Sequence, residues 1–90
     1  MVEFKGKVKQ EVKIAARVLD SYTRANVVVS PGKNQLKRGQ DNWLISTSEE
    51  SFLIEAFRKI HRNKYGSVRF FNSRLENFER DRQSLLAYSF

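Results

Sequence analysis

The chain has 90 residues, 40% of them hydrophobic and 12% aromatic, and 17 Lys and Arg against 10 Asp and Glu give a formal net charge of +7. This length supports one hydrophobic core, so residues 1–90 are expected to form a single basic domain rather than a disordered chain. The absence of cysteine excludes disulfides, thiolate zinc sites and thiol catalysis.

Residues 2–24 carry two successive patterns. Apolar and charged residues alternate from Val2 to Lys7, which predicts a short strand, although the same residues also fit the irregular start of a helix. From Val8 to Arg24 apolar residues recur at helical spacing, which predicts a helix. Its apolar face contains Val12, Ala15, Ala16, Leu19 and Tyr22.

The middle of the chain predicts a hairpin. The β-branched run Val27 to Val29 is followed by the breaker cluster Ser30 to Asn34, and a second strand is predicted from Asn42 to Thr47. The segment between them, KNQLKRGQDN, is polar and basic with one apolar residue, Leu36. We expect it to form a long loop.

The next helix has a clear start signal. Thr47 to Glu50 matches a capping box, in which the Thr47 hydroxyl and the Glu50 carboxylate would bond each other's backbone amides. Acidic residues near this start and basic residues near the end at Tyr65 and Gly66 suit the helix dipole. The predicted apolar stripe contains Phe52, Leu53, Ala56, Phe57 and Ile60.

The C-terminal part predicts one more strand and one more helix. The strand is expected at Ser67 to Phe71, and a second capping box at Ser73 to Glu76 opens a helix, with Phe78 facing inward, that fades near Leu85. The order (β)αββαβα predicts an α+β domain with a three- or four-stranded, antiparallel-type sheet packed by two helices plus a C-terminal helix. With the first strand, this order resembles a ferredoxin-like βαββαβ sheet.

Catalysis is not predicted. His61 is the single histidine and lies among Arg58, Arg62 and Lys64, which favours a solvated or phosphate-contacting imidazole over a general base. No second imidazole or thiol is available for a metal cage, and the carboxylates mostly suit helix starts. We therefore expect a non-enzymatic protein without cofactor, metal or catalytic residues.

The basic residues carry the functional argument. Lys9, Lys13 and Arg17 are spaced four residues apart, as is the preceding Lys5, so on a helix they would form a ridge about 12 Å long. A polyanion that follows such a ridge releases counterions, which favours binding. A solvated face that keeps the protein soluble explains the same row equally well.

Two further basic clusters and two aromatic residues add to the predicted polyanion-binding surface. Loop and helix-end cations are frequent phosphate contacts but also ordinary surface features, and bases stack on exposed aromatic rings. The sequence thus predicts a nucleic-acid-binding protein, with RNA or single-stranded or structured nucleic acid favoured. The predicted contacts are Lys9, Lys13, Arg17, Lys33, Lys37, Arg38, Arg58 and Arg62 for phosphates and Tyr65 and Phe71 for bases.

The alternative is a small protein-binding module. An assembly factor, or an inhibitor encoded by a virus or mobile element, would dock the same basic face on an acidic partner protein. The outer edge of a strand at residues 2–7 would also offer a contact for a second copy, so a homo-oligomer is left open. No apolar run reaches the roughly 20 residues of a membrane span and no signal-peptide pattern is visible, so we expect an intracellular, cytoplasmic protein without a membrane partner.

Overall fold

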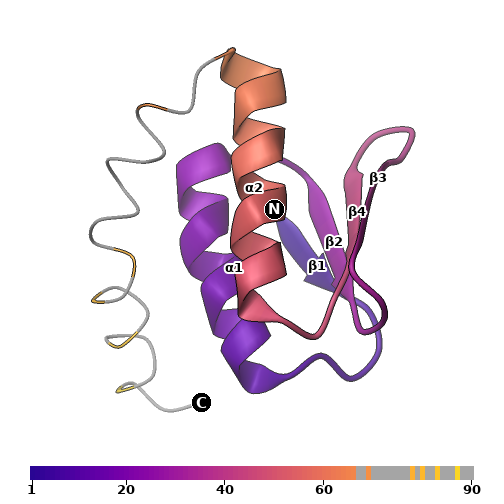
Figure 1. Cartoon of the computed structure of the whole chain (residues 1–90), viewed down its shortest axis with the longest axis vertical. Coiled ribbons are helices and arrows are strands. Elements are labelled where there is room, and N and C mark those ends of the chain that lie inside the picture. The colour runs from indigo at the N-terminus through magenta and orange to yellow at the C-terminus, as the bar shows by residue number, and fades with distance from the viewer. Residues whose placement is uncertain (67–68, 70–77, 79, 81–82, 84–86, 88–90) are drawn as a thin grey trace.

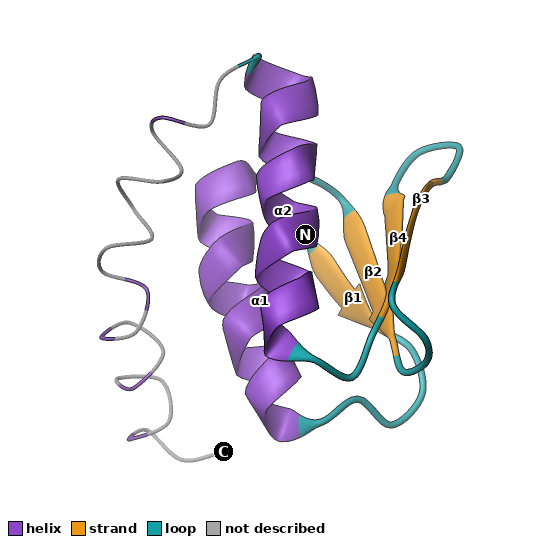
Figure 2. Cartoon of the chain, viewed as in Figure 1, coloured by secondary structure: helices purple, strands orange, loops and turns teal. Residues whose placement is uncertain are grey.

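The computed structural model describes residues 1–66 together with Arg69, Phe78, Arg80, Gln83 and Ala87. A sheet of four strands forms one layer and two helices form the other, which confirms the α+β class (Figures 1 and 2). In chain order the elements are β1 (Val2–Phe4), α1 (Gln10–Thr23), β2 (Val27–Ser30), β3 (Gln35–Arg38), β4 (Trp43–Ser46) and α2 (Glu50–Tyr65).

The strand order in the sheet is β1-β2-β4-β3. The first strand is therefore present, and it pairs in parallel with β2 after the crossover through α1. β2 also pairs in parallel with β4, while β3 pairs with β4 in the antiparallel sense. The predicted hairpin between β2 and β4 is wrong, because these two strands pair in parallel. The segment between them, which was expected to be a loop, contains β3, and β3 lies beyond β4 at the edge of the sheet.

β3 was missed because its pattern is that of an edge strand. Leu36 is its one apolar residue and pairs with Ile45, while Gln35, Lys37 and Arg38 are exposed. An outer strand needs only one inward side chain, so its sequence does not differ from that of a polar loop.

The predicted antiparallel-type, ferredoxin-like sheet is also wrong, since β1, β2 and β4 run parallel to one another. Of the predicted strand at 67–71, only Arg69 is described, and it is helical. The remainder of that range and the capping box at 73–76 lie outside the described residues. Phe78 is helical and 6% exposed, as expected for an inward residue of the final helix.

The core lies between the helices and one face of the sheet. Side chains alternate along a strand, so Val27 and Val29 face the helices together with Ile45, and all three are buried. α1 and α2 pack on this face with the apolar residues that the sequence predicts, and most of these are fully buried. Neither helix has the length and apolar character needed to cross a membrane, as judged over the described residues.

The start of α2 differs from the predicted capping box. The helix begins at Glu50 with Glu49 as its N-cap, and no side chain caps it. The Thr47 hydroxyl instead accepts a hydrogen bond from the Glu49 amide (2.9 Å) and donates one to Asn34 Oδ1 (2.7 Å). Thr47 thereby ties the turn after β2 to the start of α2. The predicted end at Gly66 is confirmed, with φ of 74° and an amide bond to the Arg62 carbonyl.

We expect Thr47→Val to lower the free energy of unfolding by about 0.5–1.5 kcal/mol, because the buried Thr47 hydroxyl loses its hydrogen bonds to Asn34 and Glu49 while the side-chain volume is kept. Urea unfolding followed by circular dichroism measures this change. Thr47→Ser keeps the hydroxyl and serves as the control. A valine variant as stable as the parent would show that this hydroxyl does not stabilise the turn.

Candidate functional site

The basic row on α1 lies beside β1. Lys9 and Arg17 are exposed, and Lys13 is half-buried with its Nζ 6.0 Å from the centroid of the Phe4 ring. Because β1 is at one end of the strand order, this row lies at the opposite edge of the described sheet from β3.

The other predicted contacts are spread over several surfaces. Lys37 and Arg38 are adjacent in β3, so Lys37 points to the uncovered face of the sheet and Arg38 to the face that the helices cover. Lys33 is exposed in the turn after β2, and Arg58 and Arg62 are exposed along α2. The ten predicted residues therefore do not form one surface.

The two predicted stacking residues also separate. Tyr65 is 52% exposed at the end of α2, while Phe71 lies outside the described residues. The expectation that His61 is solvated is wrong, because this side chain is only 3% exposed. Its ring centroid lies 4.7 Å from that of Tyr65, one helical turn later. His61 is thus part of the packing of α2.

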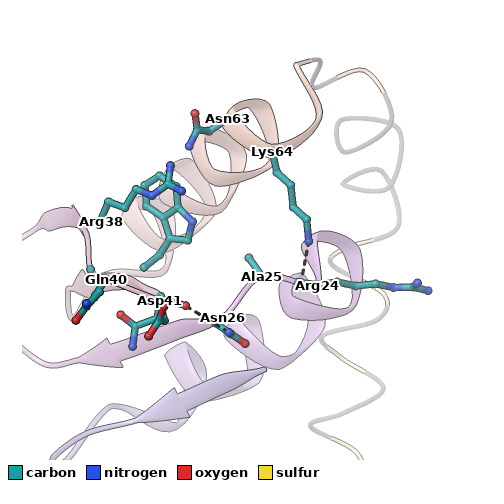
Figure 3. A pocket seen from close by; sticks show the side chains of 11 residues that line it. Arg24, Ala25, Asn26, Arg38, Gln40, Asp41, Asn63 and Lys64 are labelled. Carbon is teal, nitrogen blue, oxygen red and sulfur yellow. Dashed lines mark hydrogen bonds between the residues drawn. The ribbon is translucent and has the colours of Figure 1, made fainter.

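A cleft of about 430 Å³ opens where the ends of α1 and α2 meet the β3–β4 hairpin and the start of β2 (Figure 3). Arg38 and Trp43 line it from the hairpin, and Asn63 and Lys64 line it from α2. The remaining lining residues are Arg24, Ala25, Asn26, Gly39, Gln40, Asp41 and Asn42.

Hydrogen bonds to backbone carbonyls hold the walls of this cleft in place. The hairpin turn is closed by the Gly39 amide, which donates to the Asn42 carbonyl at 2.7 Å, and a Cβ at Gly39 would collide with the Asn42 side chain. The Trp43 amide donates to the Asn26 carbonyl at 2.8 Å, and the Asn26 side chain donates to the Asp41 carbonyl at 3.4 Å. The hairpin is thus held against the start of β2.

Arg38 and Trp43 form the central pair of the cleft. They are opposite each other in the antiparallel register, and the Arg38 guanidinium lies 5.3 Å from the centroid of the Trp43 ring. This distance is within the range of a cation–π contact. Trp43 is half-buried, so the indole is held by the protein while the pair faces the cleft.

Lys64 lies across the cleft from this pair. Its ammonium donates to the Arg24 carbonyl at 3.2 Å, which links the ends of α2 and α1. In Figure 3 the Arg24 side chain extends away from Arg38 and Asn63, so its charge lies outside the group of side chains around the hairpin. Among the described residues that line the cleft, Asp41 carries the one carboxylate, against the cations of Arg38 and Lys64.

The cleft combines positive charge, the stacked Arg38 guanidinium and Trp43 indole, and side-chain amide groups. Within residues 1–66, the side-chain amides of Gln40, Asn42 and Asn63 make no hydrogen bond to the protein. Such amides offer both donors and acceptors to a ligand. Among the described residues no group of three or more His, Asp and Glu side chains is placed to hold a metal ion.

A second, smaller hollow of about 260 Å³ lies on the uncovered face of the sheet. Val28 and Leu44 form its floor, and Lys5 and Lys37 line it from β1's end and β3. The hydroxyls of Ser30 and Ser46 lie 3.4 Å apart between the neighbouring strands. Leu44 is 38% exposed there, which makes it one of the few large apolar side chains on the described surface.

The sequence prediction included Arg38 but missed Arg24, Trp43 and Lys64 as its neighbours in a site. One local signal was present, because Gly39 to Asn42 has the composition of a tight turn and would place Arg38 opposite Trp43. The contributions of α1 and α2 depend on the parallel pairing of β2 with β4, which no local pattern reveals.

Comparison with protein-family models, with curated proteins and with solved structures finds no match to this chain. The function of this chain is therefore inferred from the geometry and charge of its surfaces.

We expect Arg38→Ala to shift the fluorescence emission of Trp43, the single tryptophan, to longer wavelength because the indole loses the side chain that covers it. The accompanying loss of stability should be about 0.5–1 kcal/mol. Lys37→Ala is the matched control, since it removes the neighbouring charge on the other face of β3. Equal emission in both variants would show that Arg38 does not lie over the indole.

Proposed function

We propose that this chain is a non-enzymatic nucleic-acid-binding protein that engages RNA or single-stranded or structured DNA through the cleft between the β3–β4 hairpin and the end of α2. The observation that carries this proposal is the Arg38–Trp43 pair, which places a guanidinium and an indole together in a basic, amide-lined cleft. Proteins that bind single strands combine aromatic platforms with cations in this way.

The charge of the whole chain supports the same function. A net charge of +7 attracts polyanions over a distance of about one Debye length and raises their rate of association. Contacts to phosphates position a nucleic acid without reading its sequence, while contacts in a concave, amide-lined site can distinguish unpaired bases. The cleft is the described surface on which both kinds of contact are available together.

The remaining predicted cations have a secondary role in this proposal. Lys9, Lys13 and Arg17 lie at the β1 edge, away from the cleft, and would contact the backbone of a longer or folded nucleic acid. Arg58 and Arg62 on α2 would do the same. Contacts of this kind depend strongly on salt and weakly on sequence.

To test this, the anisotropy of labelled single-stranded RNA, single-stranded DNA and duplex DNA is measured against protein concentration at several salt concentrations. We expect the single strands to bind more tightly than the duplex and to quench Trp43 fluorescence. Arg38→Ala should weaken binding about tenfold, since one stacked or charged contact contributes about 1–3 kcal/mol.

Arg58→Ala is the control for charge, because it also removes one exposed arginine but lies away from the cleft. We expect it to weaken binding at low salt by much less than Arg38→Ala. Equal losses in the two variants would assign binding to general charge rather than to the cleft. Binding weaker than micromolar at low salt for all three nucleic acids would overturn the proposal.

A protein-binding role is the second candidate, and the hollow on the uncovered sheet face favours it. Exposed Leu44 lies there between Lys5 and Lys37, and none of the described residues that line the hollow is acidic. An acidic partner with an apolar anchor would suit this face. In that case Lys37→Ala would reduce capture of the partner while Arg38→Ala would not, the reverse of the result expected for nucleic acid.

A further inference from the structure

We propose that the cleft accepts one unpaired nucleobase, stacked against the Arg38–Trp43 pair and bonded at its edge by the amides around it. The ligand would then be a nucleic acid that presents an unstacked base, such as a bulge, a loop or a strand end. This inference depends on the proposed function and adds to it the structural class of nucleic acid that the protein selects.

The size of the cleft supports a single nucleotide. Its volume of about 430 Å³ falls near the lower end of the range of about 300–1,000 Å³ that is typical of small-ligand sites. The hairpin turn and the last turn of α2 form its opposite walls. A base inside a continuous duplex is covered by its neighbours on both faces and cannot enter such a site without being extruded.

The stacking surface is already assembled in the protein. The Arg38 guanidinium lies over the indole at 5.3 Å, and both planes are of the kind on which bases stack. Antiparallel pairing fixes the backbones of the two residues opposite each other, so the surface belongs to a regular hairpin rather than to a loop. Little conformational entropy is therefore lost when a base binds to it.

Amide groups provide the edge contacts. Figure 3 shows the Asn63 side chain at the end of α2 turned toward Arg38, whereas the Gln40 side chain extends from the hairpin turn away from both. The Asn63 amide makes no hydrogen bond within residues 1–66 and offers a donor and an acceptor that match the edges of bases. Lys64, beside Asn63, supplies a positive charge for the phosphate that accompanies the base.

The inference is tested with three short duplexes: one fully paired, one with a single bulged nucleotide, and one with an abasic residue at the same bulge. The two bulged duplexes have the same number of phosphates, so a difference between them measures the base alone. We expect the bulged base to bind about tenfold more tightly than the abasic bulge and to quench Trp43, because the base adds a stacking contact.

Two variants locate the effect. Asn63→Ala should reduce the preference for the base without changing protein charge, whereas Gln35→Ala removes an amide on the uncovered sheet face and should leave the preference unchanged. Equal affinity for the bulged base and the abasic bulge, with both weakened by Arg38→Ala, would overturn the nucleobase inference while the proposed function stands. Failure of every duplex and single strand to bind would overturn both.

Discussion

The parallel pairing of β2 with β4 determines which elements meet at the cleft. Both strands begin at the same end of the sheet, so α1, which leads into β2, must finish at that end. β3 runs antiparallel to β4 and finishes at the same end, while α2 starts at the opposite end and returns to it. The cleft forms there because the chain topology brings together the C-terminal ends of both helices and the turn of the hairpin.

The same topology determines the electrostatics of the cleft. Anion sites are often built at helix N-termini, where free amides face the ligand. Here α1 and α2 both present their C-terminal ends, whose carbonyls favour cations, and the Arg24 carbonyl does accept a hydrogen bond from Lys64. Positive potential in the cleft must therefore come from side chains. Arg62 and Lys64 in the last turn of α2 suit the dipole of that helix, and Lys64 also adds positive charge at the cleft.

The sequence predicted local structure well and the sheet order poorly. Helical periodicity located both described helices, because their apolar faces consist of residues close in sequence, and the valine run marked the buried central strand β2. β3 and the parallel pairing could not be inferred, since one depends on a single inward leucine and the other on contacts between distant segments.

Two residues show the same limit at side-chain level. Thr47 fits a capping box by spacing, yet its hydroxyl bonds Asn34 in a turn that the sequence pattern does not include. Arg38 was chosen for its charge, but its place in the cleft comes from a cross-strand partner in a strand that was expected to be loop.

β3 has a consequence for the behaviour of the protein in concentrated solution. It is the last strand of the described sheet on its side, and the outer backbone groups of such a strand can pair with another chain. Lys37 and Arg38 occupy this strand, and charged side chains on an edge oppose pairing between identical molecules through repulsion. A less basic hairpin would therefore have less protection of this edge against aggregation.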